Sequence, residues 1–231
     1  MLELHQMLPG VAGLAVAGLT WTSLRDRERY RRQRAVLFAD CLALFDACRV
    51  EQDDVAFASL CGTYRGREVR LEPVVDHVTF RKIPSLWLKV TLVAAVPYRG
   101  TFDLLARPRG GEFYSPFSEL ACELSKPPDW PHDAVIHVDD PALVPDTDII
   151  APHVRVFADV RMKELLVTPR GVRLVYQISQ SERTNYVVLR QLEFDELRLA
   201  PKLVMRLLDA AVALHAAVAP PAVVGMSCSP A

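Results

Sequence analysis

The sequence lacks the short motifs by which the commonest nucleotide and hydrolase sites are recognised. It contains neither the G-x-x-x-x-G-K-[ST] phosphate loop nor the G-x-G-x-x-G dinucleotide motif. G-x-S-x-G, H-E-x-x-H and the zinc-deaminase pattern are absent as well. These absences rank kinases, dinucleotide-dependent enzymes, serine hydrolases and zinc proteases low. They favour a protein without catalytic activity and without a cofactor.

Paired cysteines are also missing. The chain has an odd number of cysteines and no C-x-x-C, and the spacings suit neither a zinc site nor a disulfide framework. We therefore expect reduced thiols, which fits a reducing compartment, at Cys41, Cys48, Cys61, Cys122 and Cys228. Cys41 and Cys48 lie seven residues apart, and we interpret these two as small buried hydrophobes.

No strong excess of charge is present over the whole chain. The net charge is −1, which gives no general attraction to nucleic acid, so nucleic acid is not an expected partner. Of the 231 residues, 51% are hydrophobic and 24% charged, as in a globular protein and not in a disordered one.

Charge is completely absent from residues 4–24, and six arginines with two acids follow within residues 25–34. Three interpretations stay open. A bilayer anchor fits the uncharged run and its basic flank, which by the positive-inside rule places the body in the cytoplasm, at the inner membrane. A secretory signal peptide fits less well, because Glu3 stands in the usually basic start and arginines follow the cleavage-like Ala15-Val-Ala17. In the third, the protein is cytoplasmic and its apolar N-terminus packs on its own core or on a partner.

We expect four parts in the chain. They are an apolar N-terminal segment (1–24), a juxtamembrane helix (25–49), an α+β domain (50–219) and a disordered tail (220–231). The helix is predicted because residues 24–49 contain no glycine or proline, and because apolar residues recur on one face. These residues are Leu37, Cys41, Leu44 and Cys48.

Alternation and turn residues predict a strand-rich body. Tyr64-Arg-Gly-Arg67 and Pro169-Arg-Gly171 indicate two hairpins, one between residues 57–64 and 68–75 and one between 164–168 and 172–178. The strongest strand, 87–96, is expected at the centre and to turn at Tyr98-Arg-Gly100 into a strand over 101–107. Weaker strands are predicted at 134–138 and 186–194, and a short helix at 149–158.

Pro201 opens an amphipathic helix whose apolar face is formed by Leu203, Leu207, Ala211, Leu214 and Val218. Strands in hairpins with helices before, between and after them indicate the α+β class. We expect a mostly antiparallel sheet that helices cover on one face, preceded by an N-terminal helix.

Two groups of polar residues could carry chemistry. Asp76 and His77, close to the basic pair Arg81 and Lys82, could bind an anion or serve as acid and base, and we take these four as the candidate ligand-binding residues. A polar turn before the central strand would explain the same residues.

The second group is a connection rich in histidine and aspartate. Such side chains can hold a divalent metal that activates water, although aspartate at these places also suits turns and helix caps. A polar surface connection is the favoured interpretation, and no metal site is assigned. The group comprises His132, Asp133, His137, Asp139, Asp140, Asp146, Asp148 and His153.

The order of parts resembles an uncharacterised group of bacterial proteins with an apolar N-terminus, an arginine-rich juxtamembrane helix and a β-rich domain that opens with G-x-[YF]-x-G-R. The corresponding parts are residues 7–24, residues 25–34 and Gly62-Thr-Tyr-Arg-Gly-Arg67. Residues 81–88 and 171–175 also look like features of such proteins. The resemblance implies a membrane-tethered cytosolic domain and transfers no catalytic residue.

The expected function is a cytosol-facing domain that associates with a membrane through residues 4–24 and binds a partner protein or ligand without catalysis. Two alternatives stay open. One is a metal-dependent hydrolase that uses the connection 132–153. The other is a structural subunit of a membrane complex, in which Gly13 and Ala17, four residues apart, lie at a helix–helix contact.

Overall fold

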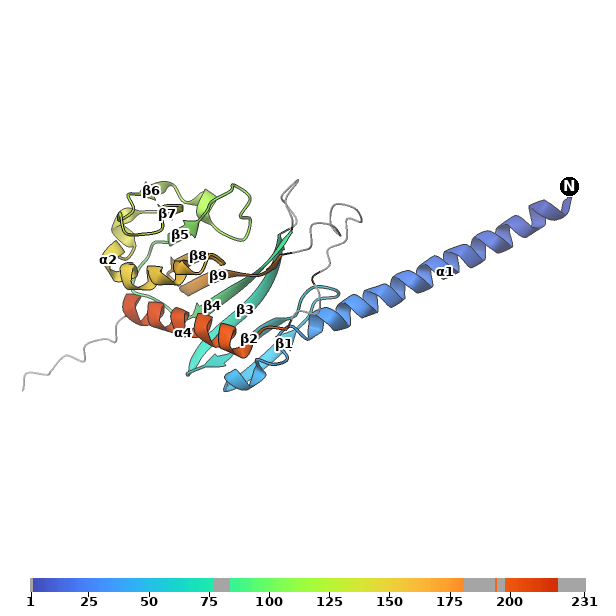
Figure 1. Ribbon diagram of the computed structural model, residues 1–231, viewed down its shortest axis with the longest axis horizontal. Helices are drawn as coiled ribbons and strands as arrows, with labels where there is room; N and C mark the ends of the chain where they lie inside the picture. Colours follow the sequence, from blue (N-terminus) through green and yellow to red (C-terminus); the bar gives the residue numbers. More distant parts are fainter. Residues whose placement is uncertain (1, 77–83, 181–193, 195–197, 220–231) are drawn as a thin grey trace, which may run out of the picture.

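The computed structural model describes residues 2–76, 84–180, 194 and 198–219 (Figure 1). Within these residues nine strands form one sheet in the order β1-β2-β3-β4-β9-β8-β5-β7-β6, and every neighbouring pair is antiparallel. The predicted α+β class with a mostly antiparallel sheet is confirmed.

The strands alternate with helices and short 3-10 turns along the chain. The strands are β1 (Ala47–Glu51), β2 (Ser59–Tyr64), β3 (Arg67–Asp76), β4 (Ser85–Val93), β5 (Phe102–Ala106), β6 (Cys122–Leu124), β7 (Ala134–Val138), β8 (Met162–Thr168) and β9 (Gly171–Gln180). The helices are α1 (Leu2–Ala35), α2 (Thr147–Ile150), which the 3-10 helix η4 (Ala151–Ala158) continues, and α4 (Pro201–Val218). Three shorter 3-10 turns are η1 (Leu42–Leu44), η2 (Phe117–Glu119) and η3 (Pro141–Leu143).

Both predicted hairpins are present. Between β2 and β3, Arg65 and Gly66 have φ angles of 49° and 72°, as a two-residue turn of the primed type requires. Between β8 and β9, Gly171 has a φ of 147°, which glycine adopts far more readily than residues with a Cβ atom.

Strand β4 lies in the interior of the sheet, between β3 and β9. From Leu86 to Val93 its buried residues alternate strictly with partly exposed ones, so one face of the strand is core and the other is not. The buried residues are Leu86, Leu88, Val90 and Leu92. The expectation of a central strand here is met, since five strands lie on one side of β4 and three on the other.

The expected hairpin from β4 into the strand at 101–107 is wrong. That strand exists as β5, but it pairs with β7 and β8 and not with β4. The turn before it is instead bound to the segment after β7, because Gly100 N donates to Leu143 O.

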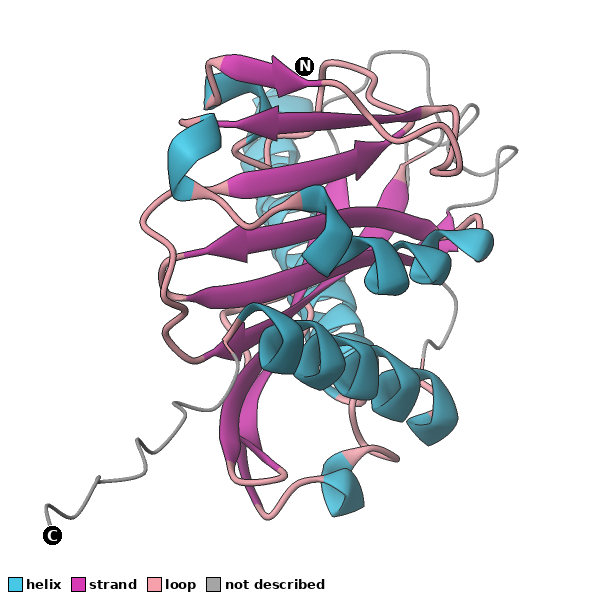
Figure 2. Ribbon diagram, turned by 90° about the vertical axis from the view of Figure 1, so that its left-hand side faces the viewer, coloured by secondary structure: helices cyan, strands magenta, loops and turns pink. Residues whose placement is uncertain are grey.

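Helices cover one face of the sheet, as predicted. Helix α4 packs on β4 and β9, and η4 packs on β8 and on α4, so that both lie on the same side (Figure 2). Leu207, Ala211, Leu214 and Val218 of α4 are buried, whereas Leu203 is only partly so. The opposite face is polar over β2, β3 and β4 and is covered near β5 and β8 by the segment after β5.

The N-terminal helix ends earlier than the sequence suggested. Helix α1 stops at Ala35, and residues 47–51, of which the first three were expected in the same helix, form the edge strand β1. The reason is that Leu37, Phe38 and Cys41 are buried in the core, and Leu199 N donates to Leu37 O, which pulls the chain away from the helix axis. Consequently Cys41 and Cys48 do not share a helix face. The expectation that both are buried is wrong for Cys48, which is exposed on the edge strand β1.

The predicted strand at 186–194 and the predicted tail at 220–231 fall largely or wholly outside the described residues. In the part of the chain that the structure describes, no helix has the length and apolar character needed to cross a membrane.

Candidate functional site

Helix α1 extends away from the body, and its N-terminal end lies far from the sheet (Figure 1). The large apolar side chains described along it are highly exposed: Leu14 is 76% accessible, Leu19 71% and Trp21 70%. Burying such side chains is favourable by roughly 25 cal/mol for each Å² removed from water. The helix therefore presents apolar surface that could be covered only by something outside the described residues.

The base of α1 is held to the body on one side. Arg27 forms an ion pair with Asp54, with 2.7 Å between Nη2 and Oδ1. Arg34 donates to Val55 O at 2.7 Å, and its guanidinium lies over the Phe57 ring. Burial lowers the pKa of Arg34. These contacts fix the direction in which the helix leaves the body.

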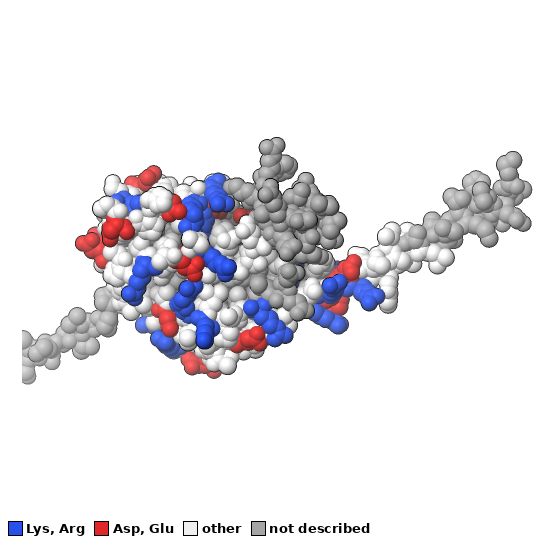
Figure 3. Space-filling model, in the orientation of Figure 1, with Lys and Arg blue, Asp and Glu red and all other residues white. Residues whose placement is uncertain are grey.

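Other arginines of the same segment make no such contacts. Arg25, Arg29 and Arg31 are exposed and form no ion pair with the described residues, while Arg32 pairs with Glu28 one turn before it. Trp21, Arg25 and Arg29 follow one another at intervals of four residues, so they share one face of the helix. Figure 3 shows basic side chains at the base of α1 with acidic ones among them, and both signs of charge mixed over the body.

The candidate ligand-binding residues are described only in part. Asp76 is the last residue of β3 and lies opposite Ser85 of β4. His77, Arg81 and Lys82 lie outside the described residues, so the prediction that these four residues form a site stays a prediction.

The histidine- and aspartate-rich connection has structural contacts instead of a metal cluster. His137 stacks on Phe117, with ring centroids 3.9 Å apart, and Asp133 lies 3.6 Å from the Arg107 guanidinium. Asp139 accepts from Thr101 N, and Asp140 accepts from Ala142 N at the start of η3. Among the described residues no group of three potential ligands is placed to hold a metal ion.

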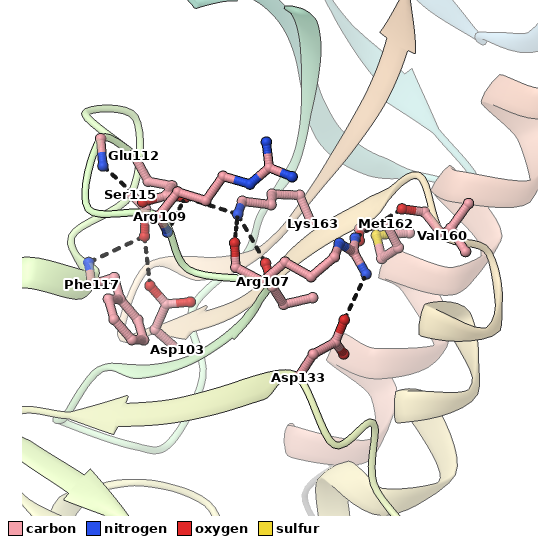
Figure 4. A network of polar contacts seen from close by, with 12 residues as sticks. Asp103, Arg107, Arg109, Glu112, Ser115, Phe117, Asp133, Val160, Met162 and Lys163 are labelled. Atoms are coloured by element: carbon pink, nitrogen blue, oxygen red, sulfur yellow. Dashed lines mark hydrogen bonds and ion pairs between the residues drawn. The ribbon is translucent and has the colours of Figure 1, made fainter. Parts of the chain in front are cut away.

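The most strongly perturbed polar groups lie elsewhere, on the sheet face opposite α4. Lys163 of β8 is inserted beneath the segment after β5, where its Nζ donates to Glu112 and to the carbonyl oxygens of Ala106 and Arg107 (Figure 4). Burial lowers the pKa of Lys163, and the bond to Glu112 offsets this only in part. Burial acts to raise the pKa of Glu112, but the Lys163 ammonium and two backbone N–H groups lower it on balance.

A pair of buried carboxyl groups is adjacent. Asp103 of β5 and Glu164 of β8 are both fully buried. Arg173 of β9 binds both oxygens of Glu164, at 3.0 and 3.3 Å. Ser115 Oγ donates to Asp103 Oδ2 at 2.8 Å (Figure 4). Burial, and then the Glu164 charge, raise the pKa of Asp103 well above its ordinary range.

Sequence reasoning missed this network. Two signals were available: a single aspartate inside Phe102–Ala106, and Lys163-Glu164 inside an otherwise apolar strand. Charged residues are seldom fully buried without a partner. Asp103, Lys163 and Glu164 were therefore each expected to have a partner from another segment, but only the strand pairing identifies that partner.

Comparison of the chain with known protein families, with curated proteins and with solved structures finds no match. The chemistry of the described residues is therefore the basis for assigning a function. Two features stand out among these residues: the exposed apolar and basic helix α1, and the buried acid pair Asp103 and Glu164.

Proposed function

We propose that this protein is a non-catalytic interaction domain attached by α1 to the cytoplasmic face of an anionic inner membrane. The apolar N-terminal part of α1 enters the bilayer, and the arginines at its base lie among the lipid headgroups. The body then stays on the side where the arginines are.

The observation that carries this proposal is the arrangement of side chains along α1. Exposed apolar residues occupy its outer part, exposed arginines occupy the part next to the body, and Trp21 lies at the boundary. Tryptophan is enriched at this boundary between lipid tails and headgroups, and arginines close to an anionic surface add electrostatic attraction. A protein partner would not require this order of apolar, aromatic and basic residues along a single helix.

The attachment is tested by flotation of the full-length protein with vesicles of phosphatidylcholine alone or mixed with phosphatidylglycerol. We expect the protein to float with the mixed vesicles. Replacing two exposed apolar residues with charge, in L14D/L19D, removes surface whose insertion stabilises the bound state, so this variant should stay in the bottom fraction. Equal flotation of the variant and the wild-type protein would overturn the proposal.

The role of the arginines is tested separately by comparing R25Q/R29Q with R27Q. Arg25 and Arg29 are free to contact lipid phosphates, whereas Arg27 is paired with Asp54. An arginine near an anionic surface contributes about fivefold to binding, so the double variant should bind the mixed vesicles roughly twenty- to thirtyfold more weakly. R27Q should bind almost as the wild type does, and added salt should weaken wild-type binding.

A further inference from the structure

We propose that Asp103 and Glu164 form a buried proton-binding site whose occupancy holds residues 107–117, here called the strap, against the sheet. This device is independent of the membrane attachment. It rests on two carboxyl groups, one guanidinium and one hydroxyl that meet beneath the strap.

The strap leaves β5 and folds back over the sheet. Arg107 and Gly110 have φ angles of 51° and 74°, which turn the chain sharply after the strand. Its returning part is buried: Ser115 donates to Asp103, and the Tyr114 ring packs against Trp87 of β4, with centroids 5.7 Å apart. The strap therefore shields Asp103 and part of Trp87 from water.

The acid pair lies directly under this segment. Leu105 of β5 is opposite Glu164 and Asp103 is opposite Leu166, so Asp103 and Glu164 are diagonal neighbours on one face of the sheet. The guanidinium of Arg173 is engaged with both oxygens of Glu164. Oδ1 of Asp103 accepts no hydrogen bond from any described residue. An ionised Asp103 would thus be a second buried negative charge beside one guanidinium.

Charged and titratable groups face Asp103 from every element around it. Burial raises its pKa most, followed by Glu164 of β8, while Ser115 of the strap and Arg173 of β9 lower it by less. Glu112 and Tyr114 complete the strap side, and Tyr114 has a raised pKa because of burial and the surrounding carboxylates. On β7, His137 is the residue paired with Asp103, and its Nδ1 lies 3.0 Å from Phe117 O.

When the strap lies against the sheet, here called the closed form, a proton on Asp103 removes the second buried negative charge. The protonated carboxyl can donate toward Glu164. Oδ1 of Asp103, which has no donor among the described residues, then no longer needs one. When that proton is lost, the closed strap keeps two carboxylates out of water, and lifting it hydrates Asp103. The bond from Ser115 opposes opening, but a single hydroxyl compensates only part of the desolvation of a carboxylate.

The sign of the pH dependence follows from this scheme. With the strap open, Asp103 has an ordinary carboxyl pKa near 3.8, and with the strap closed its pKa is higher. Between these two values the closed form holds more protons than the open form, so raising the pH favours opening. The opening equilibrium should increase up to about tenfold per pH unit in this window and level off above it.

Hydrogen–deuterium exchange of the strap amides in the full-length protein tests this inference. The wild-type protein and Asp103→Asn are compared at the same pH, so that intrinsic exchange chemistry cancels. Asparagine is neutral at every pH and can still donate toward Glu164. The two proteins should exchange alike near pH 4, and above it the wild-type strap should exchange increasingly faster, by about tenfold per pH unit until the plateau.

Asp133→Asn is the matched control, since Asp133 lies at the base of the strap and contacts Arg107 but is partly exposed. It should follow the wild-type pH profile. Equal strap exchange in the wild type and Asp103→Asn at every pH would overturn the inference. Should Asp103→Asn not fold, the wild type is referenced to a free peptide of residues 107–117. A ratio that does not change with pH would equally overturn it.

Discussion

The Nζ of Lys163 lies 2.8 Å from Oε1 of Glu112, and the two side chains are only 5% and 10% exposed. This ion pair joins β8 to the strap, and the same ammonium also satisfies two backbone carbonyl groups at the end of β5. Removing one partner from a buried ion pair leaves the other charge buried and unpaired, which is far more costly than losing an exposed pair.

We therefore predict that Lys163→Met destabilises the protein by about 3–5 kcal/mol. The Glu112 carboxylate loses its counter-ion and keeps only two backbone N–H donors, and two carbonyl groups lose the ammonium. Urea unfolding followed by circular dichroism measures this change. Lys89→Met is the control, since Lys89 pairs with Glu72 at 3.4 Å and Glu72 is 45% exposed. That variant should lose less than about 1 kcal/mol. Similar losses of unfolding free energy in the two variants would show that the buried Lys163–Glu112 pair contributes no more to stability than the exposed one.

The fold could be predicted from the sequence wherever the signal was local. Gly66 and Gly171 marked two hairpins, and the apolar face of Pro201–Val218 marked α4, because turn geometry and helical period are properties of neighbouring residues. The pairing of β5 with β7 and β8 was not predictable in this way, since register between distant strands depends on the packed core. The end of α1 at Ala35 has the same cause: Leu37 and Phe38 continue a helical pattern but are held in the core.

The candidate site shows the same division. The uncharged run and its arginines could be recognised directly, and the structure adds that Arg27 is paired while Arg25 and Arg29 are not. Asp103 stood out only as an acid in an apolar strand. Its neighbour Glu164 comes much later in the chain, and only the β5–β8 register brings the two together.

Asp159 provides a pH dependence of the opposite sign to that of Asp103. Its carboxylate accepts from Arg161 N, from Tyr176 Oη and from Arg206 of α4, at 2.8–3.0 Å. Burial acts to raise the pKa of Asp159, but these donors lower it on balance. A lowered pKa in the folded state stabilises the protein above the ordinary carboxyl pKa of 3.8, and this contribution is lost as the pH falls through the folded value.

Asp159→Asn should accordingly cost about 1–3 kcal/mol near pH 7, the usual range for hydrogen bonds to a charged group. The difference from the wild type should shrink below about pH 4, where the wild-type carboxylate is also neutralised. Urea unfolding at several pH values measures both effects. Asp148→Asn, at an exposed position in α2, should change little at any pH. A loss that stays constant down to about pH 2 would assign the effect to packing and not to charge.

The cysteines should differ strongly in reactivity. Cys41 is fully buried, its thiol donates to Leu199 O at 3.2 Å, and burial raises its pKa to about 11. Cys48 on the edge strand β1 is exposed. Because the thiolate is the reactive form, near pH 8 only about one in a thousand Cys41 side chains would be ionised even if reagent reached them.

We expect iodoacetamide to label Cys48 in the native protein within minutes and Cys41 only after unfolding in urea. Peptide mapping by mass spectrometry distinguishes the two sites, and Cys48→Ser should remove the rapid label at that position. Native labelling of Cys41 at a rate similar to Cys48 would mean that the segment after α1 opens frequently. This would contradict its place in the core.

Gly171 is the position at which an added methyl group should be most harmful. A Cβ atom there would lie 2.0 Å from Leu92 O, and the φ of 147° disfavours any residue with a Cβ. Gly66, in the other hairpin, also has a positive φ of 72°, but its surroundings are open. Gly66→Ala should therefore lower the stability only by the strain of placing alanine in a left-handed conformation, about 1–2 kcal/mol.

Gly171→Ala must in addition displace the carbonyl of β4 or break the last pairs of the β4–β9 ladder, so we expect a loss above about 4 kcal/mol, which is exceptional for one substitution. Thermal unfolding of both variants measures the difference. It combines the collision, which affects Gly171 alone, with a less favourable backbone, because a φ of 147° lies far outside the left-handed region near which Gly66 lies. If Gly171→Ala were no less stable than Gly66→Ala, the chain at the β8–β9 turn would have to be free to move away from β4. The close β4–β9 approach at this end would then contribute little to stability.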